Sequence, residues 1–106
     1  MVDITEADWK VFKQIKERAL EKFCLECLDE YKVIIERADL TPHERYLLNY
    51  QTVRERDKEL AQIFDGLSRS RALTQLLMIR HEELADEGLI AQLSELLQTQ
   101  THPKNF

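Results

Sequence analysis

The chain has 106 residues, the usual size of a single domain with its own core, and its formal net charge is -5. Such a charge argues against broad binding to nucleic acid, because that binding draws its energy from basic side chains that neutralise phosphates. No basic leader precedes an apolar stretch, and no apolar run approaches the roughly 20 residues of a membrane span. We therefore expect one domain over 1–106, without a membrane segment, in the cytoplasm.

The composition favours helices. Hydrophobic residues make up 43% of the chain and charged residues 33%, with only two glycines and two prolines. A chain rich in Leu, Glu, Lys, Arg and Gln and poor in turn-forming residues forms helices more readily than strands. We predict an all-α fold, namely an antiparallel helical bundle of three long helical segments plus a short C-terminal helix.

The first helix is predicted over about residues 6–38. Thr5 is a suitable N-cap, and Glu6 and Asp8 place negative charge at the positive end of the helix. Apolar residues then recur at helical spacing at Phe12, Ile15, Ala19, Phe23, Cys27, Tyr31, Ile34 and Ala38. A helix of this length is a rod of about 50 Å, whereas a compact domain of this size has a radius of gyration near 13 Å. We expect the rod to overhang any globular body.

The second helix has the clearest start. Thr41 suits an N-cap, Pro42 suits the first helical position, and Glu44 can return the capping hydrogen bond. Asp65-Gly66 reads as the end of the helix. The break before Thr41 is short, so the first two helices should pack antiparallel. The predicted buried stripe is Leu47, Tyr50, Val53, Leu60, Phe64 and Leu67.

Two further helices are expected. Ser68 can cap a third helix, and a polar stretch over 81–87 separates it from a short fourth helix that ends near Gln98. Residues 99–106 have no periodicity and are expected to form a frayed tail. The stripe of the third helix is Leu73, Leu76 and Leu77, with Leu84 as a further candidate, and that of the fourth is Leu89, Ile90, Leu93, Leu96 and Leu97.

The cysteines form a C-x-x-C, Cys24 and Cys27, in the middle of the first helix. A reactive thiol needs a helix N-terminus or basic neighbours, whereas Glu26, Asp29 and Glu30 would raise a thiol pKa. The histidines, His43, His81 and His102, are scattered singly, and none lies three residues after a carboxylate as in the metal sites of helical bundles. The cysteines are interpreted as free core thiols, and no metal site is expected.

Catalytic and cofactor signatures are also missing. Gly66 and Gly88 are the only glycines, and neither belongs to a phosphate-binding loop. No serine nucleophile pattern occurs. We predict no catalytic residues and no cofactor, and an enzymatic role is the less favoured reading.

One segment carries an alternative function. Residues 66–76 are similar to the turn and recognition helix of helix-turn-helix DNA binders, in which Arg69, Arg71 and Gln75 would face the DNA. The position four before Gly66 is Gln62, where such motifs usually have alanine. A DNA-binding regulator is therefore the second hypothesis. In the competing reading the arginines pair with acidic helices of the same chain.

The first hypothesis is a small helical interaction or regulatory protein. Trp9, Phe12 and Ile15 would lie at an uncovered end of the first helix and would be too apolar to leave in water. We therefore assign partner binding to these three residues with Arg69 and Arg71, and expect a homodimer, with a further protein partner possible and nucleic acid disfavoured. Alternatively, the short fourth helix covers them within the chain. A distant third hypothesis is a small-molecule-binding or catalytic bundle with a pocket between helices.

Overall fold

The structure is a computed structural model that describes residues 4–105, and over that range it contains helices and no strand. The all-α prediction is confirmed. The elements in chain order are α1 (Glu6–Ile35), α2 (Pro42–Phe64), α3 (Arg69–His81), α4 (Glu87–Ile90), α5 (Glu95–Gln100) and a 3-10 helix, η1 (Pro103–Asn105).

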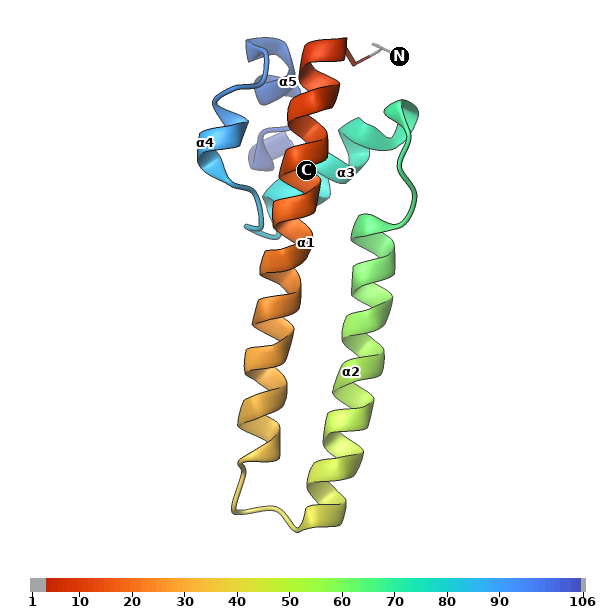
Figure 1. The fold of residues 1–106 in the computed structure, drawn as a ribbon, viewed down its shortest axis with the longest axis vertical. Helices are drawn as coiled ribbons and strands as arrows, with labels where there is room; N and C mark the ends of the chain where they lie inside the picture. The colour runs from red at the N-terminus through yellow and green to blue at the C-terminus, as the bar shows by residue number, and fades with distance from the viewer. Residues whose placement is uncertain (1–3, 106) are drawn as a thin grey trace.

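The molecule divides into a head and a stalk (Figure 1). α1 and α2 lie side by side and run in opposite directions, while α3, α4 and α5 gather around the N-terminal half of α1. We call residues 4–23 and 60–105 the head, and residues 24–59 the stalk. The molecule measures 52 × 23 × 23 Å, so the stalk extends well beyond the head, as the length of the first helix predicted. Within the described residues, no helix is long and apolar enough to cross a membrane.

Both predicted helix starts are confirmed. The Thr5 hydroxyl accepts a hydrogen bond from the Asp8 backbone N–H at 3.1 Å. At α2, the Thr41 hydroxyl accepts from the Glu44 N–H at 3.1 Å, and the Glu44 carboxylate accepts from the Thr41 N–H at 2.9 Å, which completes the capping box. Gly66 has φ +79° just after α2, in the left-handed region that glycine adopts readily.

Several boundaries differ from the prediction. α1 ends at Ile35, three residues early, and Ser68 precedes α3 without making a capping hydrogen bond. The single short C-terminal helix is replaced by α4 and α5, because Asp86 and Ser94 each cap a separate helix, accepting from Leu89 and Leu97.

The C-terminal segment also differs from the frayed tail that was expected. Thr101 is fully buried, and its hydroxyl donates to the Leu97 carbonyl at 2.7 Å. Arg80 of α3 donates to the Gln98 carbonyl at 2.8 Å and to the Thr101 hydroxyl oxygen at 3.0 Å. These contacts attach residues 98–101 to α3. Phe106 lies outside the described residues.

The core lies almost entirely in the head. The inner face of α1 packs against α3, α4 and α5, and against the C-terminal end of α2. Its largest fully buried apolar side chains are Phe12, Ile15, Leu76 and Ile79.

Candidate interaction surface

The residues predicted to bind a partner lie in the head, and two of them are inaccessible. Phe12 and Ile15 are fully buried in the core formed with α3 to α5. Trp9 is partly buried and stacks on Phe12, with ring centroids 5.8 Å apart. The expectation that this end of α1 is uncovered is wrong, because the C-terminal third of the chain covers it, as the alternative reading proposed.

Arg69 and Arg71 differ in their surroundings. Arg69 forms an ion pair with Glu6 of α1, and its guanidinium lies 5.3 Å from the centre of the Trp9 ring. The hydrogen bond from Arg69 lowers the pKa of Glu6 below its ordinary value. Arg71 is exposed on the first turn of α3. Arg69 thus pairs with an acidic helix of the same chain, which was the competing reading.

Gln75 does not face outward, as a DNA-reading residue must. Its side chain is buried, and its amide N–H groups donate to the carbonyls of Asp65 and Gly66 at 2.9 and 3.1 Å. These carbonyls stand at the end of α2, where helix geometry leaves carbonyls without a partner. The prediction that Gln75 faces DNA is wrong, because the residue closes the α2 end instead.

The cysteines are free thiols on the stalk side of α1. Cys27 is buried, and this burial raises the pKa of its thiol. Cys24 is half-buried. Among residues 4–105, no group of three or more His, Cys, Asp or Glu side chains is arranged to hold a metal ion.

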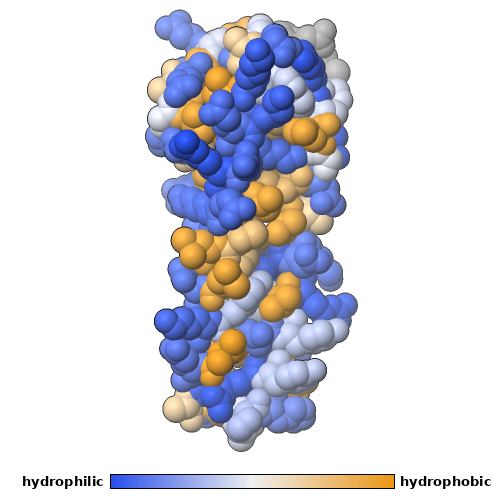
Figure 2. Space-filling model, in the orientation of Figure 1, coloured by the Kyte–Doolittle hydropathy of each residue, from blue (hydrophilic) through white to orange (hydrophobic). Residues whose placement is uncertain are grey.

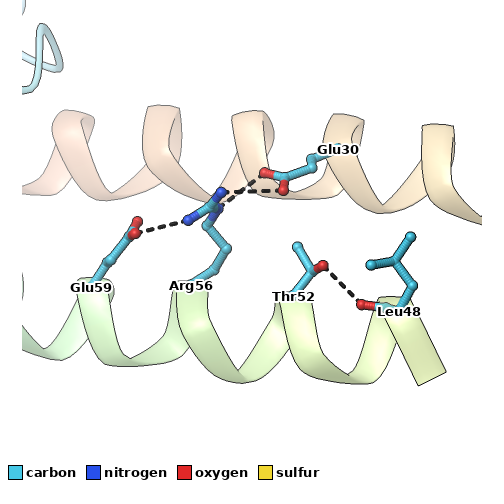
Figure 3. A network of polar contacts seen from close by, with 5 residues as sticks. All are labelled: Glu30, Leu48, Thr52, Arg56 and Glu59. Atoms are coloured by element: carbon cyan, nitrogen blue, oxygen red, sulfur yellow. Dashed lines mark hydrogen bonds and ion pairs between the residues drawn. The ribbon is translucent and has the colours of Figure 1, made fainter. Parts of the chain in front are cut away.

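The seam between the two stalk helices combines apolar side chains of α1, where Cys27 and Ile34 are buried, with polar side chains of α2. Arg56 of α2 donates to both carboxylate oxygens of Glu30 of α1, at 3.0 and 3.2 Å, and to Glu59 at 2.8 Å (Figure 3). One turn earlier, the buried Thr52 hydroxyl donates to the Leu48 carbonyl of its own helix (Figure 3). α2 therefore directs charged and hydroxyl side chains toward α1 over most of the stalk.

Nearer the tip, the seam contains polar atoms that are not satisfied. Arg45 Nε and Asn49 Oδ1 are buried without a hydrogen-bond partner among the described residues, although another nitrogen of Arg45 donates to the Ile35 carbonyl at 2.8 Å. Leaving a buried donor or acceptor unpaired costs about 1–3 kcal/mol.

Many apolar residues of the stalk are exposed. Of the large hydrophobic side chains that are exposed in the described residues, most belong to the stalk: Leu25, Leu28, Val33, Ile35, Tyr46, Leu47, Tyr50 and Val53. In Figure 2, hydrophobic residues run along the middle of the stalk between two hydrophilic flanks. α1 buries its apolar stripe through Cys27 and Ile34, whereas much of the apolar surface of α2 in the stalk stays exposed.

Two open grooves define one continuous surface on the stalk. The groove near the head has a volume of about 200 Å³ and includes Leu28 and Tyr31, and the groove at the tip has about 500 Å³ and includes Ile35, Tyr46 and Tyr50. Val53 lines both grooves. We call these residues, Leu28, Tyr31, Ile35, Tyr46, Tyr50 and Val53, the stalk face.

Helical spacing explains why these side chains share one side. Leu28, Tyr31 and Ile35 follow one another by three and four residues on α1, and Tyr46, Tyr50 and Val53 by four and three on α2. Burial raises the pKa of Tyr31 to about 12, so its hydroxyl stays neutral beside the apolar groups. The stalk face offers apolar contact and tyrosine hydroxyls.

Sequence reasoning did not identify the stalk face, because it placed Leu47, Tyr50 and Val53 in the buried stripe of α2. That prediction is wrong for these three residues and for Leu67, which are exposed, and the stripes predicted for the later helices are wrong for Leu73 and Leu96. The rotation of α2 is set in the head, where Ile63 and Phe64 are both buried. From Ile63, steps of seven and four residues lead back to Arg56 and Thr52. Including Ile63 in the stripe would have indicated the polar seam.

Comparison of the chain with models of known protein families, with curated proteins and with solved structures finds no match.

Proposed function

We propose that this is a small helical interaction or regulatory protein that acts through the stalk face and not through a catalytic centre. One observation carries the proposal: apolar side chains of both stalk helices line two open grooves and stay exposed, although Cys27 and Ile34 are buried between the helices. Burying a large apolar side chain contributes about 1.5–3 kcal/mol, so a partner that covers several of them gains substantial binding free energy. Aromatic residues such as Tyr46 and Tyr50 are also enriched at protein interfaces.

The head serves as the rigid part in this proposal. Its packed core fixes the N-terminal half of α1, and α1 continues without interruption into the stalk, so the stalk is held as an extension of the core. We extend the proposal to the expected antiparallel bundle: α1 and α2 form its antiparallel pair, and a docked partner supplies the missing helices. The free thiols suit the reducing cytoplasm as the place of action.

The test compares exposed apolar positions on two sides of α1. Leu28 on the stalk face is 62% exposed, and Val33, which lines neither groove, is 64% exposed. The tagged full chain, expressed at native level, is separated by size in lysate of its source cells. We expect the wild type and Val33→Glu to migrate above the monomer mass of 12.6 kDa, and Leu28→Glu to migrate as a monomer. Migration of all three as monomers, or equally in one complex, would refute the proposal.

The other two hypotheses have less support. In the helix-turn-helix reading, Gln75 is occupied with the end of α2 and Arg69 with Glu6, which leaves Arg71 as the one exposed reader. Retention of a DNA duplex at physiological salt, lost in Arg71→Ala, would favour that reading. For a small-molecule bundle, the groove in the head beside Leu73 and Leu96 has a volume of about 130 Å³, below the roughly 300 Å³ at which ligand pockets begin. The groove at the stalk tip is large enough at about 500 Å³, but it is open and mostly apolar, so binding of an apolar small molecule there, lost in Tyr50→Glu, would favour that reading.

A further inference from the structure

We infer that the head binds a small zwitterionic α-amino acid in the groove where the start of α1, the first half of α3 and α5 meet. We call this groove, which has a volume of about 130 Å³, the head groove. It shares no residue with the stalk face, so binding there is independent of the proposed function.

Two charged residues of opposite sign line the head groove, Asp8 of α1 and Arg69 of α3, and its other lining residues are neutral. The two charges are not paired with one another. Within the described residues, Arg69 forms its ion pair with Glu6, and Asp8 forms no ion pair but accepts hydrogen bonds from Ser94. The head groove therefore offers a negative and a positive group to one ligand.

Asp8 can hold an ammonium group. It is 5% exposed, and each of its carboxylate oxygens accepts one hydrogen bond from Ser94. A carboxylate has about four acceptor positions, so each oxygen keeps one for a further donor. Burying an ionised carboxylate without a positive partner is unfavourable, and a ligand ammonium supplies that partner.

Arg69 can hold a carboxylate. Its nitrogen Nη2 donates to Glu6, whereas a guanidinium has five N–H donors in all. Arg69 and Ser70 belong to the first turn of α3, where the N-cap Ser68 makes no capping hydrogen bond. The positive end of α3 therefore adds to the charge of Arg69 on this side of the head groove.

A ligand with both charges fits better than a ligand with one. A simple amine would lie near Arg69 and the positive end of α3, and a simple carboxylate would lie near the buried Asp8. Each of these ligands meets a group of its own sign, which costs affinity. The ammonium and the carboxylate of a zwitterion both find an opposite charge.

The size of the head groove limits the amino acid to a small one. Liquid water occupies about 30 Å³ per molecule, so the head groove holds about four water-sized groups. Glycine and alanine are close to this size, whereas a drug-sized ligand needs at least roughly 300 Å³.

The walls of the head groove also suit such a ligand. Leu73 and Leu96 are 37% and 57% exposed, so they can contact the methyl group of alanine. The Thr74 hydroxyl and the Gln100 amide form no hydrogen bond with other described residues and are additional neutral polar partners. The head groove thus combines two charged groups, neutral polar groups and a small apolar wall.

The experiment is isothermal titration calorimetry of the purified full chain with L-alanine, n-propylamine and propionate as separate probes. The last two probes carry only the ammonium or only the carboxylate. We expect one alanine per chain, and binding at least about 10-fold weaker for each probe with a single charge. Trp9 is the only tryptophan and lies 5.3 Å from the Arg69 guanidinium, so its fluorescence is a second readout of binding.

The variants remove the two charged groups one at a time. Arg69→Gln should weaken alanine binding at least about 10-fold. The matched control is Lys13→Gln, which should leave binding unchanged, because Lys13 also lies over the Trp9 ring, at 5.7 Å, but does not line the head groove. Asp8→Asn should abolish binding, with folding checked by circular dichroism. Thr74→Phe fills the head groove from an exposed position and should abolish binding without touching Asp8.

Three results would overturn the inference. One is no alanine binding at concentrations up to about 10 mM. Another is binding of n-propylamine or propionate as tight as that of alanine, which would mean a site for a single charge. The third is alanine binding that Arg69→Gln, Thr74→Phe or a folded Asp8→Asn leaves unchanged, because the ligand would then lie elsewhere.

Discussion

The Asp8 carboxylate near the start of α1 accepts two hydrogen bonds from Ser94, one from the backbone N–H at 2.8 Å and one from the hydroxyl at 2.6 Å. Ser94 is also the N-cap of α5, and its hydroxyl oxygen accepts from the Leu97 N–H at 3.3 Å. A single buried side chain therefore attaches the C-terminal helices to α1.

Asp8→Ala should lower the free energy of unfolding by about 1.5–3 kcal/mol, the range for hydrogen bonds to a charged group. Urea denaturation followed by circular dichroism measures this loss. The matched control is Glu17→Ala, which removes an exposed carboxylate from the same helix and should change stability by less than about 0.5 kcal/mol. Equal midpoints for Asp8→Ala and wild type would contradict the role of the Asp8–Ser94 contact.

Thr41→Ala should cost about 1 kcal/mol, because it removes the hydroxyl that accepts from the Glu44 N–H at the start of α2. The same denaturation experiment measures the shift. Thr41→Ser keeps an oxygen at this position and should restore most of the loss. An alanine variant with the midpoint of the wild type would show that the cap is not needed.

The capping box also makes stability depend on pH. The Thr41 N–H holds the pKa of Glu44 below its ordinary value of 4.5. A carboxyl with a lowered pKa in the folded state contributes stability that is fully present above pH 4.5 and is lost as pH falls through the lowered value. The stability difference between wild type and Glu44→Gln should therefore be constant near neutral pH and shrink on acidification below about pH 4.5. A difference that does not change down to pH 2 would contradict this.

Gln75→Ala should destabilise the fold by about 1–3 kcal/mol, because it leaves the Asp65 carbonyl without the side-chain donor that closes α2. The control is Gln62→Ala on the exposed side of α2, which should be nearly neutral. Hydrogen exchange offers a second measurement, since the amides of the last turn of α2 should exchange faster in Gln75→Ala. Unchanged exchange there would mean that the Gln75 hydrogen bonds contribute nothing.

Cys24 should report whether the stalk face is covered. In the Leu28→Glu monomer, a thiol-specific disulfide reagent should modify half-buried Cys24 quickly and Cys27 slowly, because burial raises the pKa of Cys27 and so lowers its thiolate fraction. In the complex that the wild type is proposed to form, the fast rate should be lower, because a partner on the stalk face would cover the groove that Cys24 lines. Cys24→Ala should abolish the fast phase. An equal fast rate for the wild-type complex and for Leu28→Glu would count against a covered stalk face.

Local signals predicted the helices well, because they act over a few residues. The caps at Thr5 and Thr41 and the positive-φ Gly66 fall where residue type and helix chemistry require them. The apolar stripe of α1 is also confirmed over Phe12 to Cys27, since one dominant face leaves no choice of rotation. The split between α4 and α5 was missed because the partner of Ser94, Asp8, is distant in sequence.

The orientation of α2 could not be obtained from its own periodicity. By spacing and residue type, Tyr50 and Val53 fit a buried stripe, and Thr52 and Arg56 fit an exposed one. In the structure Thr52 and Arg56 face α1, whereas Tyr50 and Val53 are exposed. The rotation of α2 about its axis is determined by Ile63 and Phe64, which are buried in the core of the head. The interaction surface therefore follows from tertiary packing at one end of a helix, which a local pattern does not contain.

The two sides of the head core come from opposite ends of the chain and are therefore synthesised at different times. Phe12 and Ile15 are made early, but Leu76, Ile79 and Leu97, which cover them, are made in the last third of the chain. At about 5–20 residues per second, a ribosome needs several seconds to make that last third. During this interval the nascent α1 is apolar on the side that later enters the head and on the stalk face. A chain that stops after α2 would keep both surfaces open and should aggregate.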